Sequence, residues 1–175
     1  MVGIGPGALL ARQQQSRLEA DVKATFLYHF SRYVDWPSAA PGSQKDSPFR
    51  VCVLAESAFE RSVAAVLKDE TLHGRRVIWS VPATPDAARS CQILYIDENE
   101  SERVRFVTAL RTLPVLTVSD APDFLAEGGH IALVRDDKRI RFDISLPAAT
   151  QSGLALRSQL LRVARKVIRT TGGHP

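Results

Sequence analysis

Apolar residues recur at helical spacing near the start of the chain, from about Arg17 to Trp36. The apolar stripe consists of Val22, Phe26, Phe30 and Tyr33, with Leu27 and Val34 beside it. Pro37 ends the pattern, because a helix rarely continues through the residue that precedes a proline. The spacing therefore predicts an amphipathic helix over 17–36, followed by a polar loop at 38–48 that is rich in Pro, Gly and Ser.

Short β-rich apolar runs then alternate with helical patterns. The runs predict strands at 49–55, 75–81, 91–97 and 114–120, and the helical patterns lie at 56–70, 101–113 and, more briefly, 121–129. The third run is apolar enough to be buried on both faces, as parallel strands are. Strands that alternate with helices predict an α/β fold: a layered sandwich with a mainly parallel sheet and helices on both faces.

The alternation of strand and helix patterns ends near residue 130. Two alternating runs around Asp136 and Asp137 predict an antiparallel hairpin over 130–146 at one edge of the sheet. The stretch 147–170 has helical spacing and predicts one long final helix. Its expected inward positions are Leu154, Leu160, Leu161, Ala164, Val167 and Ile168, and its expected solvent-facing positions are Arg162, Arg165, Lys166 and Arg169.

Length and composition indicate one folded domain. The chain has 175 residues, of which 45% are hydrophobic and 24% charged, and its net charge of +4 is too mild for a dedicated nucleic-acid binder. No apolar run approaches the roughly 20 residues that span a bilayer, so we expect no direct membrane insertion. We predict a disordered N-terminus or signal-peptide remnant at 1–16, a single domain at 17–170 and a tail at 171–175.

No pattern in the sequence indicates a metal centre, a cofactor or a catalytic nucleophile. The four histidines, His29, His73, His130 and His174, are scattered without the paired spacing of metal ligands. A G-x-S-x-G motif is absent, and both cysteines fall inside predicted strands, where thiols are usually inert or paired. We therefore expect no Cys–His catalysis.

Polar residues follow the carboxyl ends of three predicted strands. They are Glu56 and Ser57, Asp97 and Glu98, and Ser119 and Asp120. Ligands of open α/β sheets gather at this edge, where carboxylates can hold a cation or transfer protons. Each group also precedes a helical pattern, and Ser, Asp and Glu are favoured there as caps. Capping is the better interpretation, and a small-molecule-binding or hydrolytic protein is the alternative function.

The two cysteines allow two interpretations. Cys52 lies in the first predicted strand and Cys91 opens the third. If the sheet has flavodoxin-like order, these strands are neighbours about 4.8 Å apart, which brings the cysteines within reach of a disulfide. Otherwise both are buried thiols, which behave as small apolar side chains.

Residues 23–37 are unusually aromatic. Phe26 and Phe30 suit the buried face of the predicted helix, but Tyr28, Tyr33 and Trp36 cannot all point inward from it. Aromatic side chains left outside form the kind of patch that marks an interface. We therefore predict that Tyr28, Tyr33 and Trp36 contribute to a dimer or partner surface.

Several stretches together resemble one family. They are VKATFLYHFSRYVDWP, FRVCVLAESAF, CQILYIDENE, LPVLTVSDAPDFLAEGGHIALV and KRIRFDISLPAATQSGLALRSQLLRVA. In this order, over about residues 20–168, they are similar to the YfiR-like proteins, although none of the motifs is catalytic. The resemblance implies an exported α/β protein without enzymatic activity that forms homodimers in the periplasm.

The same resemblance implies a function and a role for the cysteines. The family's type member represses an inner-membrane diguanylate cyclase and so restrains cyclic-di-GMP signalling and biofilm formation. This implies that the present protein binds the sensory domain of such a membrane signalling protein. Cys52 and Cys91 match a family cysteine pair linked to redox state, which implies a disulfide here. Some relatives carry a second pair that this chain lacks, so any redox sensitivity must rest on one bridge. Because relatives accompany different membrane sensors, the partner need not be a cyclase.

Overall fold

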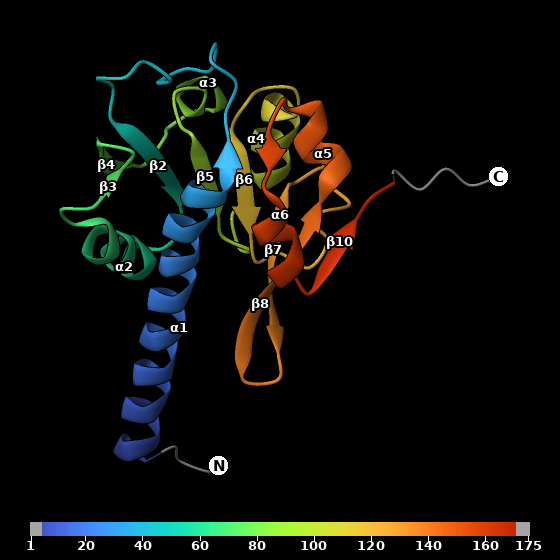
Figure 1. Cartoon of the computed structure of the whole chain (residues 1–175). Coiled ribbons are helices and arrows are strands. Elements are labelled where there is room, and N and C mark those ends of the chain that lie inside the picture. Colours follow the sequence, from blue (N-terminus) through green and yellow to red (C-terminus); the bar gives the residue numbers. More distant parts are fainter. Residues whose placement is uncertain (1–4, 171–175) are drawn as a thin grey trace.

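A central sheet separates two layers of helices and loops in the computed structural model, which describes residues 5–170 (Figure 1). Strand β2 (Phe49–Leu54) shows how the core is divided, because successive side chains of a strand point to opposite faces. Val51 and Val53 join the apolar cluster on one face, whereas Cys52 between them joins the cluster on the other. Both faces of the sheet are therefore buried, as the predicted layered α/β fold requires.

The sheet has eight strands. Besides β2 these are β3 (Thr71–Leu72), β4 (Arg75–Ser80), β5 (Ile93–Ile96), β6 (Leu116–Ser119), β7 (Ile131–Asp136), β8 (Arg139–Ser145) and β10 (Lys166–Ile168). Their order is β10-β8-β7-β6-β5-β2-β4-β3, and the run from β4 to β7 is parallel throughout. This run has flavodoxin-like order. β8 returns antiparallel to β7, which confirms the predicted hairpin and the mainly parallel α/β fold. The hairpin is not at the edge of the sheet, because β10 pairs with the outer side of β8.

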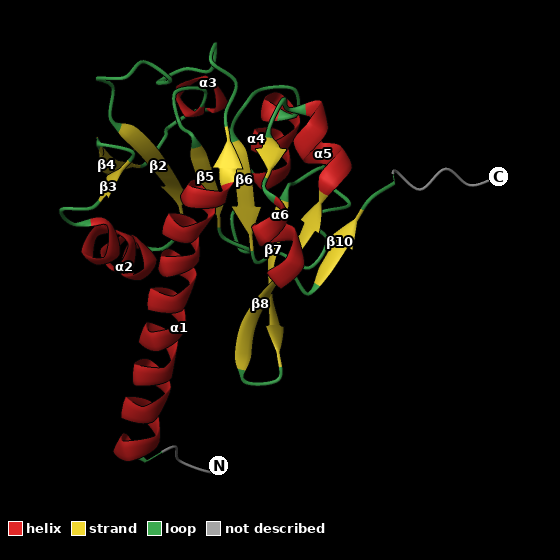
Figure 2. Cartoon of the chain, viewed as in Figure 1, coloured by secondary structure: helices red, strands yellow, loops and turns green. Residues whose placement is uncertain are grey.

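Helices lie on both faces of the sheet (Figure 2). α1 (Pro6–Tyr33) and α2 (Ser57–Leu67) bury side chains in the cluster that contains Val51, and α3 (Pro85–Ala88) and α4 (Arg103–Leu110) bury theirs in the cluster that contains Cys52. α2 and α4 match predicted helices. α3 was not predicted, because its four residues are too few to show a period.

Helix α1 differs from its predicted bounds at both ends. It begins at Pro6 rather than near Arg17, and residues 5–18 are all exposed on a part of the helix that extends past the sheet (Figure 1). It ends at Tyr33, because Val34 and Asp35 form a short strand, β1 (Val34–Asp35), which pairs with β9 (Ala155–Leu156). The prediction of helix up to Trp36 is therefore wrong; that of a signal-peptide remnant stays a prediction.

The predicted long helix over 147–170 is also wrong. The chain forms α5 (Leu146–Gln151), then β9, α6 (Ser158–Val163) and finally β10. Gly153 follows α5 with a φ of 75°, a left-handed conformation that ends a helix and that glycine adopts without strain. Beyond α6, β-branched Val167 and Ile168 pair with β8 instead of continuing a helix.

The stretch 121–129 forms consecutive turns rather than the predicted short helix. Glycine is required at each of its last two positions, 128 and 129, for a different reason. Gly128 has a φ of 103°, and a Cβ on Gly129 would lie 2.2 Å from the ring of buried Phe124. Glycine is therefore needed first for backbone conformation and then for close packing.

Candidate functional site

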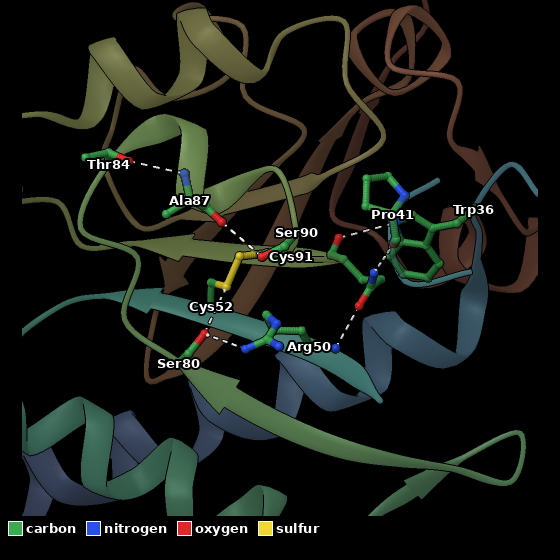
Figure 3. The surroundings of a disulfide bond; sticks show 10 residues. Trp36, Pro41, Arg50, Cys52, Ser80, Thr84, Ala87, Ser90 and Cys91 are labelled. Carbon is green, nitrogen blue, oxygen red and sulfur yellow. Dashed lines mark hydrogen bonds between the residues drawn. A yellow bond between two sulfur atoms is a disulfide. The ribbon is translucent and has the colours of Figure 1, made fainter. Parts of the chain in front are cut away.

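Cys52 and Cys91 form a disulfide beneath one face of the sheet (Figure 3). Their Cα atoms are 5.9 Å apart, and both residues are almost fully buried. The geometry follows from the strand order, because β2 and β5 are parallel neighbours and Cys91 lies just before β5. The bonded pair is therefore confirmed, and the interpretation as two free thiols is wrong.

Gln92, the residue after Cys91, connects the disulfide region to the surface loop at 38–48. Its side-chain oxygen accepts a hydrogen bond from the backbone nitrogen of Arg50 at 2.7 Å, and its amide donates to the carbonyl of Pro41. Its backbone carbonyl accepts from the indole Nε1 of Trp36 at 3.2 Å. One buried glutamine thus joins β2, the 38–48 loop and the end of the aromatic segment.

Arg75 holds the same loop from its other side. Its guanidinium donates to the carbonyl oxygens of Ser47 at 2.7 Å and Pro48 at 3.2 Å, and also to that of Gly42. The guanidinium lies 5.8 Å from the centre of the Phe49 ring, within the range of a cation–π interaction. Backbone carbonyls of a polar loop are therefore satisfied by a side chain from β4.

The substitution Arg75→Ala is expected to lower the free energy of unfolding by about 1–2 kcal/mol, because charge-assisted hydrogen bonds to the loop are lost. Hydrogen exchange should become faster in residues 38–48. Arg76→Ala is the matched control, since Arg76 is the exposed neighbour and makes none of these bonds within residues 5–170. Unchanged exchange in Arg75→Ala would contradict this role.

The three aromatic residues predicted to form a partner surface lie in different environments. Trp36 packs edge-on against Phe49 with ring centres 5.2 Å apart and is half-buried. The half-buried Tyr28 donates its hydroxyl hydrogen to the carbonyl of Thr71 at 3.1 Å. Tyr33 is 37% exposed. Two of the three rings are therefore largely used within the chain, and Tyr33 is the most available to a partner.

Polar residues at the carboxyl ends of the strands have partners within the chain. Asp120 accepts from Lys23 of α1 at 2.6 Å and from the backbone nitrogen of Glu98 at 2.9 Å. Asp97 accepts from the backbone nitrogen of Asn99 at 2.9 Å. The hydroxyl of Ser119 accepts from the nitrogen two residues later at 3.1 Å. The bonds of Asp97 and Ser119 are local turn bonds, whereas those of Asp120 reach α1 and Glu98. None of them caps a helix, because neither α2 nor α4 has a side-chain capping bond.

Glu56 and Ser57 do not join these bonds. Glu56 precedes α2 without a side-chain capping bond, and both residues are exposed. Glu56, Asp97 and Lys23 line a cleft of about 430 Å³ between α1 and the sheet edge. Within residues 5–170, no three His, Cys, Asp or Glu side chains converge as metal ligands. The ligand-site interpretation stays a prediction.

His130 is buried, and both of its ring nitrogens are hydrogen-bonded within the chain. Its Nδ1 accepts from the backbone nitrogen of Thr117 at 2.9 Å, so the proton is on Nε2, which donates to the hydroxyl of Ser152 at 2.8 Å. Ser152 in turn donates to the carbonyl of Arg111 at 2.9 Å. The serine proton therefore points away from the imidazole, and this pair is not arranged as a nucleophile and base. Burial lowers the pKa of His130 to about 4.

Most of the arginines assigned to the final helix are exposed on other elements. Arg162 lies on α6, and Arg169 follows β10. Arg165 makes two hydrogen bonds to the carboxylate of Asp143 on β8, at 2.9 and 2.5 Å.

No helix within residues 5–170 is long and apolar enough to cross a membrane.

The fold and site together define an α/β domain of flavodoxin-like strand order, in which one disulfide is tied through Gln92 to a surface loop. The chain belongs to the YfiR/HmsC-like family, whose model matches residues 20–165. This is a regulatory, non-catalytic family.

A solved structure shares the fold. It is the crystal structure of a conserved domain protein from Vibrio cholerae O1 biovar El Tor, which is 12% identical to this chain with a TM-score of 0.50. The match covers 68% of this chain and 54% of that one. The chain thus spans about half the length of that protein, and the likeness concerns the fold alone.

Proposed function

We propose that this protein is a periplasmic repressor that binds the sensory domain of an inner-membrane diguanylate cyclase or a related sensor. Binding would stabilise the inactive state of the partner, because a ligand shifts a conformational equilibrium by its difference in affinity for the two states. Cyclic-di-GMP signalling and biofilm formation would thereby be restrained. The observation that carries the proposal is the family match over residues 20–165.

The disulfide supports the proposed compartment. Disulfides persist in oxidising environments such as the bacterial periplasm and are rare in the cytosol. We propose that the Cys52–Cys91 bond also stabilises the binding-competent state, so that reduction releases the partner. Gln92 supports this idea, because it directly follows Cys91 and is hydrogen-bonded both to the 38–48 loop and to Trp36.

We further propose that the protein acts as a homodimer and that the aromatic segment contributes to a dimer or partner surface. Tyr33 supports this placement by its exposure, whereas Tyr28 and Trp36 would contribute through their accessible edges. Tyr33→Ala should therefore weaken association without destabilising the fold. Trp36→Ala should do both, since Trp36 packs on Phe49.

The test is genetic and biochemical. In the native host, deletion of the gene is expected to raise cellular cyclic-di-GMP, and a second deletion of the responsible cyclase should return it to the wild-type level. The exported, tagged protein should retain that cyclase during affinity purification from the cell envelope. Unchanged cyclic-di-GMP in the deletion strain, together with no enriched membrane signalling protein, would contradict the proposal.

A further inference from the structure

A groove of about 560 Å³ lies between helix α1 and the β7–β8 hairpin. Both elements extend beyond the rest of the domain at the same end of the molecule (Figure 1). The α1 wall includes Leu18, Val22 and Phe26, and the hairpin wall includes Arg135 and Ile140. None of the residues predicted from the sequence to form a partner surface lines this groove.

The groove is apolar along its α1 wall. Leu18 and Val22 are 60% and 43% exposed, and their spacing of four residues places them on one side of the helix together with Phe26. Phe26 packs against Phe142 of β8 with ring centres 5.6 Å apart. The apolar stripe of α1 therefore runs without a break from the core into solvent, and its outer part has no partner within residues 5–170.

The rim of the groove on the hairpin side is positively charged. Arg135 pairs with Glu19 of α1, whereas Lys138 and Arg139 are exposed and form no ion pair within the described part of the chain. Asp137 is the one acidic lining residue contributed by the hairpin. On the α1 wall the acidic lining residue is Glu19, which is paired with Arg135, and the exposed segment 5–18 before it carries Arg12 and Arg17 and no acidic residue. This end of the molecule therefore favours an anionic partner.

We propose that this groove binds an amphipathic helix that carries carboxylates beside its apolar stripe and belongs to the extracytoplasmic part of the membrane partner. The inference rests on the proposed function and names the contact surface. Helices commonly dock in apolar grooves through residues at i, i+3, i+4 and i+7. Leu18, Val22, Phe26 and Ile140 would receive that stripe, and Lys138 and Arg139 would pair with the carboxylates.

Two other occupants fit the groove less well. The α1 segment of a second copy would bring Arg12 and Arg17 toward Lys138 and Arg139, so that like charges would meet. A flat anionic membrane would reach the hairpin tip but not Phe26, which is half-buried against Phe142. A partner helix satisfies the shape and the charge together.

The experiment is site-specific photo-cross-linking in the native envelope. A photoreactive phenylalanine analogue replaces Val22 in the groove, Val104 on the opposite face or Tyr33 in the aromatic segment. Val104 is the matched control, because it is 52% exposed on α4, whose buried side chains lie in the other apolar cluster. Mass spectrometry then maps the partner peptide of each adduct.

We expect Val22, but not Val104, to give an adduct that maps to an acidic amphipathic segment of a membrane signalling protein. The double reversal Lys138→Glu/Arg139→Glu should reduce its yield several-fold, while Lys68→Glu/Arg76→Glu at exposed positions elsewhere should not. An adduct at Val22 with a second copy of this chain, with lipid or with no partner would overturn the inference. If Tyr33 alone captures the signalling protein, the groove is wrong and the proposed function stands. If no position captures one, both fail.

Discussion

Replacing both cysteines, Cys52→Ala with Cys91→Ala, is expected to lower the free energy of unfolding by about 4 kcal/mol. The bond joins residues separated by 39 positions, and the loop-entropy relation gives about 4 kcal/mol for a loop of that length. The bond acts mainly on the unfolded chain, which has fewer conformations when a long loop is closed. Because domains are typically stable by only about 5–15 kcal/mol, the loss would be a large fraction of the total.

Urea unfolding under oxidising conditions measures this effect. Wild-type protein unfolded in the presence of a thiol reductant is the internal control, because it loses the bond and keeps both sulfur atoms in the core. The two samples should agree to within about 1 kcal/mol, the remainder reflecting the small cavity left by alanine. A loss below about 1 kcal/mol in both would show that the closed loop is already ordered in the unfolded chain.

The parallel part of the sheet could be predicted because its signals are local. Each of β2, β4, β5 and β6 is a compact β-rich run, and each is bounded by turn or helix-forming residues. The disulfide was one of two interpretations that the residues left open, and it depended on the flavodoxin-like order in which β2 and β5 are neighbours, which the sheet has. Local pattern and simple topology thus account for the core of the fold.

The C-terminal segment was mispredicted because its leucines and arginines repeat at helical spacing while its structure depends on distant pairing. Ala155 and Leu156 pair with Val34 and Asp35, more than a hundred positions earlier in the chain. A bidentate pair between Arg157 and Asp35 holds the same junction, with bonds of 3.0 and 2.6 Å. Tertiary pairing overrides helical periodicity here, and Gly153 was the one local signal against a continuous helix.

In the candidate site, too, some features could be predicted from the sequence and others could not. The cysteine pair was one of two interpretations left open by the residues and was implied by the resemblance. The roles of Gln92 and Arg75 were not predicted, because their partners lie in a loop with no regular pattern. Lys23 was missed for a similar reason, since its partner Asp120 is 97 positions away. Among the loop residues that bond to Arg75, only Gly42 is marked by its residue type, because its φ of 73° favours glycine. Side-chain bonds to a loop backbone become visible only in the folded structure.

Lowering the pH from 7 toward 4 is expected to remove about 3 kcal/mol of stability through His130 alone. Its pKa is about 4 in the folded protein, because burial disfavours the charged imidazole, against 6.5 in the unfolded chain. Between pH 6.5 and 4 the imidazole therefore binds a proton in the unfolded chain but stays neutral in the folded protein. The stabilisation is complete above pH 6.5, falls by about 1.4 kcal/mol per pH unit below it, and is lost near pH 4.

Urea unfolding at a series of pH values between 7 and 4.5 isolates this group. The ion pairs with Arg103 and Arg157 lower the pKa of Glu127 and Asp35, so the stability from these carboxylates is present above their unfolded values of 4.5 and 3.8 and is lost only below them. His130→Gln keeps a polar side chain but cannot take up the proton, and its stability should be nearly constant over this range. His29→Gln, at an exposed position, should retain the wild-type slope. A slope that survives in His130→Gln would assign the acid sensitivity to another group and would leave the imidazole with a purely structural part in holding Thr117 and Ser152 together.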